Sequence, residues 1–446
     1  MSMETIRRLA RTAKYCLASA IVANMGFLAD AKAGQQPEPP PEPAWYVDEA
    51  ALPFTALPNA TAYYGIHKGA GYRIEVPNKW NGELVMYAHG HRGDGLALTV
   101  DSPSIREHLI ANGFAWAASS FSSNGYDPGQ GAYDTRALAK LFDRMVRKPK
   151  RTYMVGHSMG GHVTAVAIER WPGAFDGALP MCGNMGDNEL FDYFQDAYLV
   201  GETLIGQTPE VPMPADWATN GGPILRTSLG PAYPVLLNST GLQFKEVIKN
   251  LSGGERPIFE QSWTGPLSFT GGEFILGAMI TVPGAENLFT VYQFDQDPAL
   301  SPAEEAFNDQ IVRIAADPLY RSKHGLVLGG ASSPRINGRI HIPVLSLHTL
   351  GDLFVPFSMQ QVYAHRVARQ GRSKLLVQRA IREMNHCGFT TQEQTRAFDD
   401  LVKWVKRGVR PAGDDVLDPA VVAAPNYGCK FTEGVSPLRA LLPSCI

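Results

Sequence analysis

The sequence predicts an α/β protein in which a mostly parallel sheet is covered by helices. Short apolar segments alternate from Gly71 onward with segments of helical periodicity, the pattern of strands connected by helices. Residues 84–88 (LVMYA) form a continuous apolar run, as expected for a strand buried on both faces. A serine flanked by glycines directly follows another apolar segment and precedes a helical one, within residues 152–169.

The strands predicted in the first half are short apolar segments, namely residues 84–88, 114–119, 152–155 and 177–181. The last of them is the weakest prediction, because Pro180 has no N–H to donate to a neighbouring strand. Ser102, Pro103 and Gly113 suit the N-cap, the first turn and the end of a short helix. A longer helix over about 131–147 is predicted from apolar residues at i, i+3, i+4 and i+7, namely Leu138, Leu141, Phe142 and Met145.

The alternation stops between residues 184 and 336, where aromatic residues, glycine and proline are frequent. We expect a cap or lid inserted into the sheet domain there, with helices at about 188–204 and 302–316. One helical face would carry four apolar side chains, Leu190, Phe191, Phe194 and Tyr198. This face fits two roles equally well, covering a substrate or packing on the core.

The alternation resumes after residue 336. The expected elements are strand 344–348, a helix over about 356–368, strand 375–381 and a last helix that ends at Gly408. Thr390 and Glu393 have the spacing of a capping box at the start of that helix. Residues 410–446 show no regular pattern.

The N-terminus has the composition of a secretory signal peptide. Four basic residues (Arg7, Arg8, Arg11, Lys14) precede an apolar segment at 16–28 that is too short to span a bilayer. Ala31 and Ala33 are small residues at the positions that a signal peptidase recognises, so we expect cleavage before Gly34 and a secreted or periplasmic protein. The proline-rich residues that follow predict a stiff spacer.

The expected organisation therefore has six parts: a signal peptide (1–33), a spacer (34–44), the first part of the sheet domain (45–183), the cap (184–336), its second part (337–409) and a tail (410–446). The net charge of −3 leaves no basic excess for a phosphate backbone, so we expect no nucleic-acid partner. We also expect no stable membrane span after signal cleavage. The oligomeric state stays open.

The glycine-flanked serine is the strongest chemical signal. Residues 156–160 match G-x-S-x-G, in which a strand turns sharply into a helix and lifts the serine hydroxyl clear of the sheet. The five-residue pattern alone is weak, but here it lies between an apolar segment and a helical one, the context that it needs. Ser158 is therefore the candidate nucleophile.

A serine hydroxyl needs a base, and the base needs a carboxylate that orients it. His386 follows the last predicted strand, and Asp352 follows the strand before it, so both emerge at the same sheet edge. Asp187 is the rival acid. His157 and His162, which flank the serine, are expected to pack or to form local hydrogen bonds, and His348 is expected to be a residue at the end of a strand.

The order Ser158, Asp352, His386 resembles that of the α/β-hydrolase superfamily, over about 71–181 and 336–408. Within it, Trp80-Asn81-Gly82 leading to His89-Gly90, and His348-Thr349-Leu350-Gly351-Asp352, are similar to segments of exported bacterial serine esterases. The resemblance implies an oxyanion hole made by the backbone N–H groups of Met159 and His91. It does not extend to tannases, because His157 stands where that family has a cysteine before the serine.

Signal cleavage would remove Cys16 and leave four cysteines, which favours disulfides in an exported protein. Cys182 ends the strand after the serine turn and Cys387 adjoins His386, so we hypothesise that these two are bonded. Cys429 and Cys445 would then pair in the tail. Free buried thiols are the alternative.

The function expected from these residues is carboxylester hydrolysis by Ser158, His386 and Asp352 through an acyl-enzyme, on a small-molecule or polymeric ester, such as a hydrophobic compound or a polyester. Amide or peptide hydrolysis by the same residues is an alternative, for which we expect acidic groups in the cap that hold a substrate amine. A non-catalytic hydrolase-fold binding module is a third. We expect no cofactor and no metal site, and a solvated loop at Asp295 and Asp297 rather than a calcium site.

Overall fold

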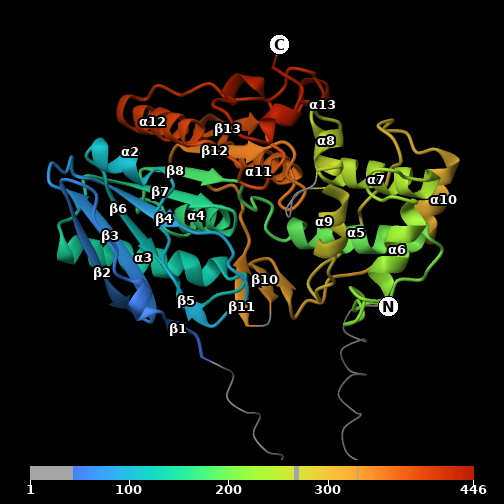
Figure 1. Ribbon diagram of the computed structural model, residues 1–446, viewed down its shortest axis with the longest axis horizontal. Coiled ribbons are helices and arrows are strands. Elements are labelled where there is room, and N and C mark those ends of the chain that lie inside the picture. Colours follow the sequence, from blue (N-terminus) through green and yellow to red (C-terminus); the bar gives the residue numbers. More distant parts are fainter. Residues whose placement is uncertain (1–43, 266–270, 329, 446) are drawn as a thin grey trace, which may run out of the picture. The chain divides into compact units, whose positions relative to one another are not determined.

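A computed structural model describes residues 44–265, 271–328 and 330–445. Its centre is a sheet of eight strands, in the order β2-β3-β6-β4-β7-β8-β12-β13 (Figure 1). The strands are β2 (Ala60–His67), β3 (Ala70–Pro77), β4 (Glu83–Ala88), β6 (Ala115–Ser119), β7 (Arg151–His157), β8 (Gly177–Met181), β12 (Val344–Thr349) and β13 (Leu376–Ile381).

The sheet is mostly parallel, which confirms the predicted fold class. Only β3 is antiparallel to its neighbours β2 and β6, and each other neighbouring pair runs parallel. The β2–β3 hairpin turns at Lys68 and Gly69, both with positive φ, and β2 lies before the segment in which alternation was predicted. Two further short strands, β1 (Tyr46–Val47) and β5 (Ala97–Leu98), pair with each other.

β8 lies between β7 and β12 despite its proline. The backbone N–H groups of Ala178 and Cys182 donate to Pro343 and Leu347 on the β12 side. Pro180 lies between them and has no N–H, so the ladder to β12 lacks one bond there. All five residues of the strand are buried.

Helices cover both faces of the sheet. Alternate residues of β4 show this, because Leu84 and Met86 belong to one apolar cluster while Val85 and Tyr87 belong to another. The first cluster includes residues of α3 (Pro128–Met145), α4 (Met159–Arg170) and α11 (Ser358–Arg369). The second includes residues of α2 (Arg106–Ala111) and α12 (Thr391–Arg407).

Helix starts and ends differ from the sequence prediction at several places, including the start of α3 at Pro128 rather than near residue 131. α2 begins at Arg106 rather than near Pro103, because the preceding residues form a turn in which the Arg106 N–H donates to the Pro103 carbonyl. α10 (Pro302–Gln310) ends earlier than expected, since Ile311 has extended backbone angles. The capping box of Thr390 and Glu393 and the left-handed Gly408 at the end of α12 are confirmed.

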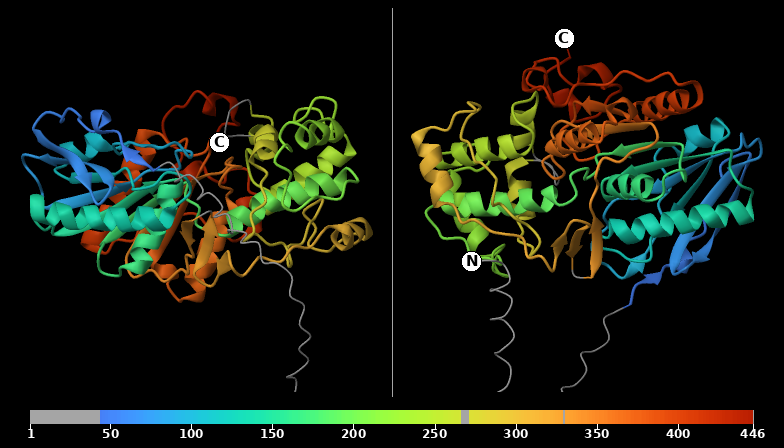
Figure 2. Two further views of the ribbon diagram at one scale, coloured as in Figure 1. Left: turned by 90° about the horizontal axis from the view of Figure 1, so that it is seen from below. Right: turned by 180° about the vertical axis from the view of Figure 1, so that it is seen from behind.

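The chain between β8 and β12, residues 182–343, contains more regular structure than the two helices predicted. Besides α5 (Glu189–Leu204) and α10, it forms α6 (Gly221–Leu229), α7 (Ser239–Leu251), α8 (Phe259–Trp263) and α9 (Gly271–Ala278). A three-stranded sheet follows, made of β9 (Arg321–Ser322), β10 (Gly325–Leu328) and β11 (Ala331–Pro334). Helices α5 to α9 pack against one another (Figure 2).

The entry and exit of the 182–343 segment meet at one buried arginine of α11. Arg366 donates to Asp187 Oδ2 at 2.5 Å and to the Gly186 carbonyl at 3.2 Å, both at the entry. The same guanidinium donates to the Ile336 carbonyl, at the exit, at 2.8 Å. Arg366 therefore fixes both ends of the segment to the sheet domain.

The C-terminal residues are held against the sheet. Arg382, which follows β13, donates to the Tyr427 carbonyl at 2.9 Å and also to the Pro425 carbonyl. The tail contains α13 (Pro419–Val422) and two short 3-10 helices. The predicted signal peptide and all of the spacer except Ala44 lie outside the described residues. Within the described part, no helix has the length and apolarity that crossing a membrane requires.

Candidate active site

Ser158 lies in a sharp turn between β7 and α4. Its backbone angles are φ 55° and ψ −122°, a conformation that L-residues rarely adopt. The turn needs glycines on both sides, because a Cβ on Gly156 would collide with the Gly160 carbonyl and one on Gly160 with the Ala88 carbonyl. The glycines predicted from the motif thus allow the close approach of α4 to β4 and β7.

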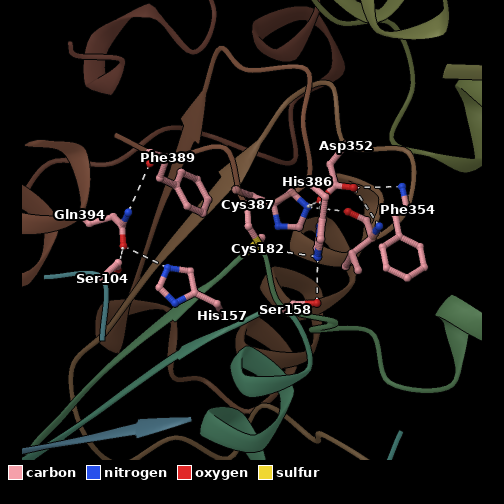
Figure 3. Close-up of a disulfide and its surroundings, with 12 residues drawn as sticks. Ser104, His157, Ser158, Cys182, Asp352, Phe354, His386, Cys387, Phe389 and Gln394 are labelled. Carbon is pink, nitrogen blue, oxygen red and sulfur yellow. Dashed lines mark hydrogen bonds and ion pairs between the residues drawn. A yellow bond between two sulfur atoms is a disulfide. The ribbon is translucent and has the colours of Figure 1, made fainter. Parts of the chain in front are cut away.

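The three candidate residues, Ser158, Asp352 and His386, come together at the carboxyl edge of the sheet (Figure 3). Ser158 Oγ lies 2.8 Å from His386 Nε2, and His386 Nδ1 lies 2.6 Å from Asp352 Oδ2. A carboxylate only accepts, so Nδ1 carries the proton and Nε2 accepts the serine O–H. This arrangement can remove a proton from Ser158 and stabilise the resulting imidazolium.

Asp352 is completely buried and well supplied with donors. Its Oδ1 accepts the backbone N–H groups of Phe354 and Val355, each at 2.9 Å. Its Oδ2 also lies 3.8 Å from His348 Nε2. The carboxylate is therefore held in one orientation, with Oδ2 directed at His386.

The rival acid Asp187 does not reach His386. It is buried against Arg366, and its Oδ2 also accepts the Ile336 N–H at 2.7 Å. Asp187 thus has a structural partner on α11.

The other histidines are hydrogen-bonded, but the partners of His157 and His162 lie far away along the chain rather than locally as predicted. His162 Nε2 donates to the Pro334 carbonyl, and His348 Nε2 donates to the Val355 carbonyl at 2.7 Å. His157 Nε2 lies 3.0 Å from Gln394 Oε1. Burial lowers the pKa of His157 and that of His162 to about 4, and it also lowers the pKa of His348. All three are therefore neutral near pH 7.

The strand order decides the fold. It follows the chain order except that β4 and β6 exchange places, β3 alone runs against its neighbours, and the glycine-flanked turn joins β7 to α4. The chain has the α/β-hydrolase fold. Asp352 and His386 follow β12 and β13, so Ser158, Asp352 and His386 occur along the chain in the order that is typical of this fold.

No family model matches the chain, but individual proteins are similar to it. The chain is 24% identical over 426 residues to an o-phthalyl amidase from Xanthobacter agilis, covering 81% of this chain and 90% of that protein. Feruloyl esterase B from Aspergillus oryzae is similar in structure, with 13% sequence identity and a TM-score of 0.40 over 79% of this chain and 82% of that one. Proline iminopeptidase from Mycobacterium smegmatis has 12% identity and a TM-score of 0.37, over 77% and 97%.

The residues expected to supply the oxyanion hole lie next to Ser158. Met159 is the first residue of α4, where backbone N–H groups have no partner within the helix. His91 follows Gly90, and a Cβ on Gly90 would lie 3.1 Å from Ser158 Cβ, so the loop after β4 passes directly beside Ser158. The two backbone N–H groups remain the predicted oxyanion donors.

Both hypothesised cysteine pairs are bonded in the structure, Cys182 to Cys387 and Cys429 to Cys445. The first bond joins the end of β8 to the residue after His386. Within the described residues, the one group of side chains close enough for a metal ion is Cys182, His386 and Cys387. Its two sulfurs form the disulfide, so they offer no thiolate ligands.

Sequence analysis missed an aromatic group beside His386. The Phe354 ring lies 5.2 Å from the His386 ring in an edge-on arrangement, and it stacks on Phe194 of α5 at 5.9 Å. Phe274 of α9 contacts Phe354 at 5.0 Å. The four apolar residues predicted on α5 are all buried, and one of them, Phe194, contacts Phe354 beside His386.

Arg256 was also missed. This buried residue of the 182–343 segment donates through Nε to the Leu350 carbonyl at 2.8 Å, in the loop that carries Asp352. Burial lowers the pKa of Arg256 to about 10. Arg256 also donates to the nearby Gly254 carbonyl and Ser252 hydroxyl, but Leu350 lies far away along the chain, and no local sequence pattern signals that contact.

Proposed function

We propose that the protein is a serine hydrolase that cleaves carboxylic esters through an acyl-enzyme. The observation that carries this proposal is the continuous hydrogen-bond chain from Ser158 through His386 to Asp352, on a strained strand–turn–helix. Each member has the geometry that its role requires. A non-catalytic module has no need of a buried carboxylate held by two backbone donors beside that histidine.

In the proposed reaction, Ser158 Oγ attacks the ester carbonyl while His386 Nε2 takes the serine proton. The backbone N–H groups of His91 and Met159 stabilise the oxyanion, and Asp352 stabilises the imidazolium. When the tetrahedral intermediate collapses, the bond to the alcohol oxygen breaks and His386 gives its proton to that oxygen. Water then attacks the acyl-enzyme with His386 again as the base, and the carboxylic acid leaves.

Ser158→Ala tests this proposal. We expect hydrolysis of p-nitrophenyl esters to fall by at least about 1000-fold, because the nucleophile is lost while the surrounding turn keeps its backbone. Labelling by a fluorophosphonate probe should disappear as well. Ser373→Ala, at an exposed serine, is the matched control and should retain both activities. Undiminished turnover by Ser158→Ala would exclude the mechanism.

Amide hydrolysis by the same residues is the second candidate, and the similarity to an o-phthalyl amidase favours it. Matched p-nitrophenyl esters and p-nitroanilides of the same aromatic and aliphatic acids would separate the two activities. An amidase should cleave the anilides at rates comparable to the esters, whereas an esterase should cleave the esters alone. The aminopeptidase-like form of this candidate requires an acid for the substrate amine. The α5 acids Asp192 and Asp196 are engaged by Arg321 and Tyr292 instead.

We further propose that the protein is exported and that residues 184–336 act as a cap. Two disulfides support export, since such bonds persist in oxidising compartments. The contact of Phe194 with Phe354 beside His386 supports the cap. A mature protein whose N-terminus is Gly34 by mass spectrometry is the expected outcome, and an intact residue 1 in the exported protein would contradict it.

A further inference from the structure

We infer that Gln394 is a positioning residue that ties the Ser158 turn to the loop carrying His386. The inference rests on the proposed function, because it concerns the alignment of the proposed nucleophile and base. Gln394 lies in the first turn of α12 and is 5% exposed. It is not part of the hydrogen-bond chain that joins Ser158, His386 and Asp352. Its side chain contacts the neighbours of both (Figure 3).

The two ends of the Gln394 amide bind different sides of the site. Its Nε2 donates to the Phe389 carbonyl at 3.3 Å, three residues after His386. Its Oε1 lies 3.0 Å from Nε2 of His157, the residue directly before Ser158. The Ser104 hydroxyl donates to the same Oε1 and holds it in place.

These contacts fix the proton on His157. The Phe389 carbonyl accepts only, so the amide end that faces it is the donor and the other end is the acceptor. His157 therefore carries its proton on Nε2 and donates it to Gln394. This assignment agrees with the lowered pKa of His157, which burial keeps neutral. The Nδ1 atom of His157 has no hydrogen-bond partner among the described residues, so Gln394 supplies the one hydrogen bond of this ring there, and Tyr87 contacts the ring edge-on.

The disulfide provides a second anchor for the same loop. Cys387 is bonded to Cys182 at the end of β8, and its Sγ lies 3.4 Å from His386 Nε2. The Phe389 N–H donates to the Cys387 carbonyl at 2.7 Å, which links the two anchored residues.

Both anchors start from neighbouring strands. His157 of β7 pairs with Met181 of β8, and the Ser158 N–H donates to the Met181 carbonyl at 3.0 Å. The His386 loop is therefore attached at two points to the two strands that hold Ser158. Either attachment alone limits the movement of the loop, and loss of both removes these two restraints on the Ser158–His386 distance and leaves His386 held by Asp352 and Phe354.

The test is a double-mutant cycle with Gln394→Met, Cys182→Ala/Cys387→Ala and their combination. Methionine has a similar volume but makes neither hydrogen bond. We expect each change to lower kcat about 10-fold with KM within about two-fold, since a small misalignment slows chemistry more than binding. The combination should lower kcat by more than about 1000-fold, beyond the product of the two, because the anchors substitute for each other.

Gln392→Met is the matched control, at an exposed glutamine two residues earlier on α12, and should keep full activity. Gln394→Glu keeps the acceptor for His157 but loses the donor to Phe389, so its kcat should lie between those of Gln394→Met and the unaltered protein. Thermal melts of all variants report the folded fraction. Loss of kcat that merely follows a fall in Tm, or a Gln394→Met variant with unaltered kcat, would overturn the inference.

Crystal structures separate this inference from the proposed function. The Ser158 Oγ–His386 Nε2 distance should lengthen in Gln394→Met and lengthen further in the combined variant, whether or not any ester is cleaved. An unaltered protein that neither hydrolyses esters or amides nor reacts with a fluorophosphonate would remove the proposed function alone. An unchanged distance in the combined variant would remove the role of Gln394.

Discussion

At the scale of single residues, His348 holds the loop that carries Asp352. Its Nε2–H donates to the Val355 carbonyl, and its Nδ1 accepts from Gln360 Nε2 at 3.1 Å. His348→Leu would leave both buried partners unsatisfied, so we expect a loss of about 1–3 kcal/mol in the free energy of unfolding. Turnover should fall too, because the loop no longer fixes Asp352. Urea unfolding and kcat measure the two effects, and the exposed His341→Leu is the control. Equal stability of the two variants would count against this role.

The candidate site residues differ in how far sequence could predict them. Ser158, Asp352 and His386 follow strand ends in a recognisable order, so local pattern and topology suffice to bring them together. Gln394 contacts His157 across 237 residues of sequence, and its contact with Phe389 depends on how α12 docks. A glutamine in the first turn of a helix has no signature that distinguishes it from a solvated residue. Such contacts become visible only once the elements are packed.

At the scale of elements, the hydrogen bonds of Arg366 to both ends of the 182–343 segment predict a large loss of stability from one substitution on α11. Arg366→Met would leave the buried Asp187 carboxylate without its cation and free the entry of the 182–343 segment. We expect a loss of about 3–5 kcal/mol in the free energy of unfolding, as for other buried pairs that lose one partner. Arg369→Met, one turn later and exposed, should change little. Urea unfolding of the two variants checks the prediction, which similar midpoints would refute.

Elements of the sheet domain were easier to predict than those of the 182–343 segment. β4 contains the continuous apolar run at residues 84–88, and α12 has both a capping box and a glycine stop. By contrast, α6 and α9 begin with paired glycines, and α8 has only five residues. Glycine disfavours helices by propensity, so packing against neighbouring helices overrides the local signal there.

At the scale of the whole molecule, the free energy of unfolding at acid pH depends on two sets of buried groups, histidines and carboxylic acids, whose contributions change in opposite directions as the pH falls. Burial lowers the pKa of His89 and that of His162 to about 4. These histidines therefore lower the free energy of unfolding as the pH falls below the histidine pKa of the unfolded chain. Burial raises the pKa of Asp192 to about 6 and that of Asp196 well above its usual value. Protonation of these acids in the folded protein raises the free energy of unfolding as the pH falls through the same range. The pH profile of the whole protein is therefore a difference between the two sets.

The substitution His162→Gln measures how much one buried histidine contributes to the pH dependence of the free energy of unfolding. The unfolded chain takes up a proton at His162 between pH 6.5 and pH 5 while the folded protein does not, so this group lowers the free energy of unfolding by about 2 kcal/mol over that range. His162→Gln removes the proton uptake and leaves the acids unchanged. The variant should be less stable at pH 6.5, because His162 is buried and bonded to the Pro334 carbonyl, and its deficit should shrink by about 2 kcal/mol at pH 5. Urea unfolding at both pH values measures the deficit, and a deficit that stays constant would show that His162 is protonated alike in the folded and unfolded chains.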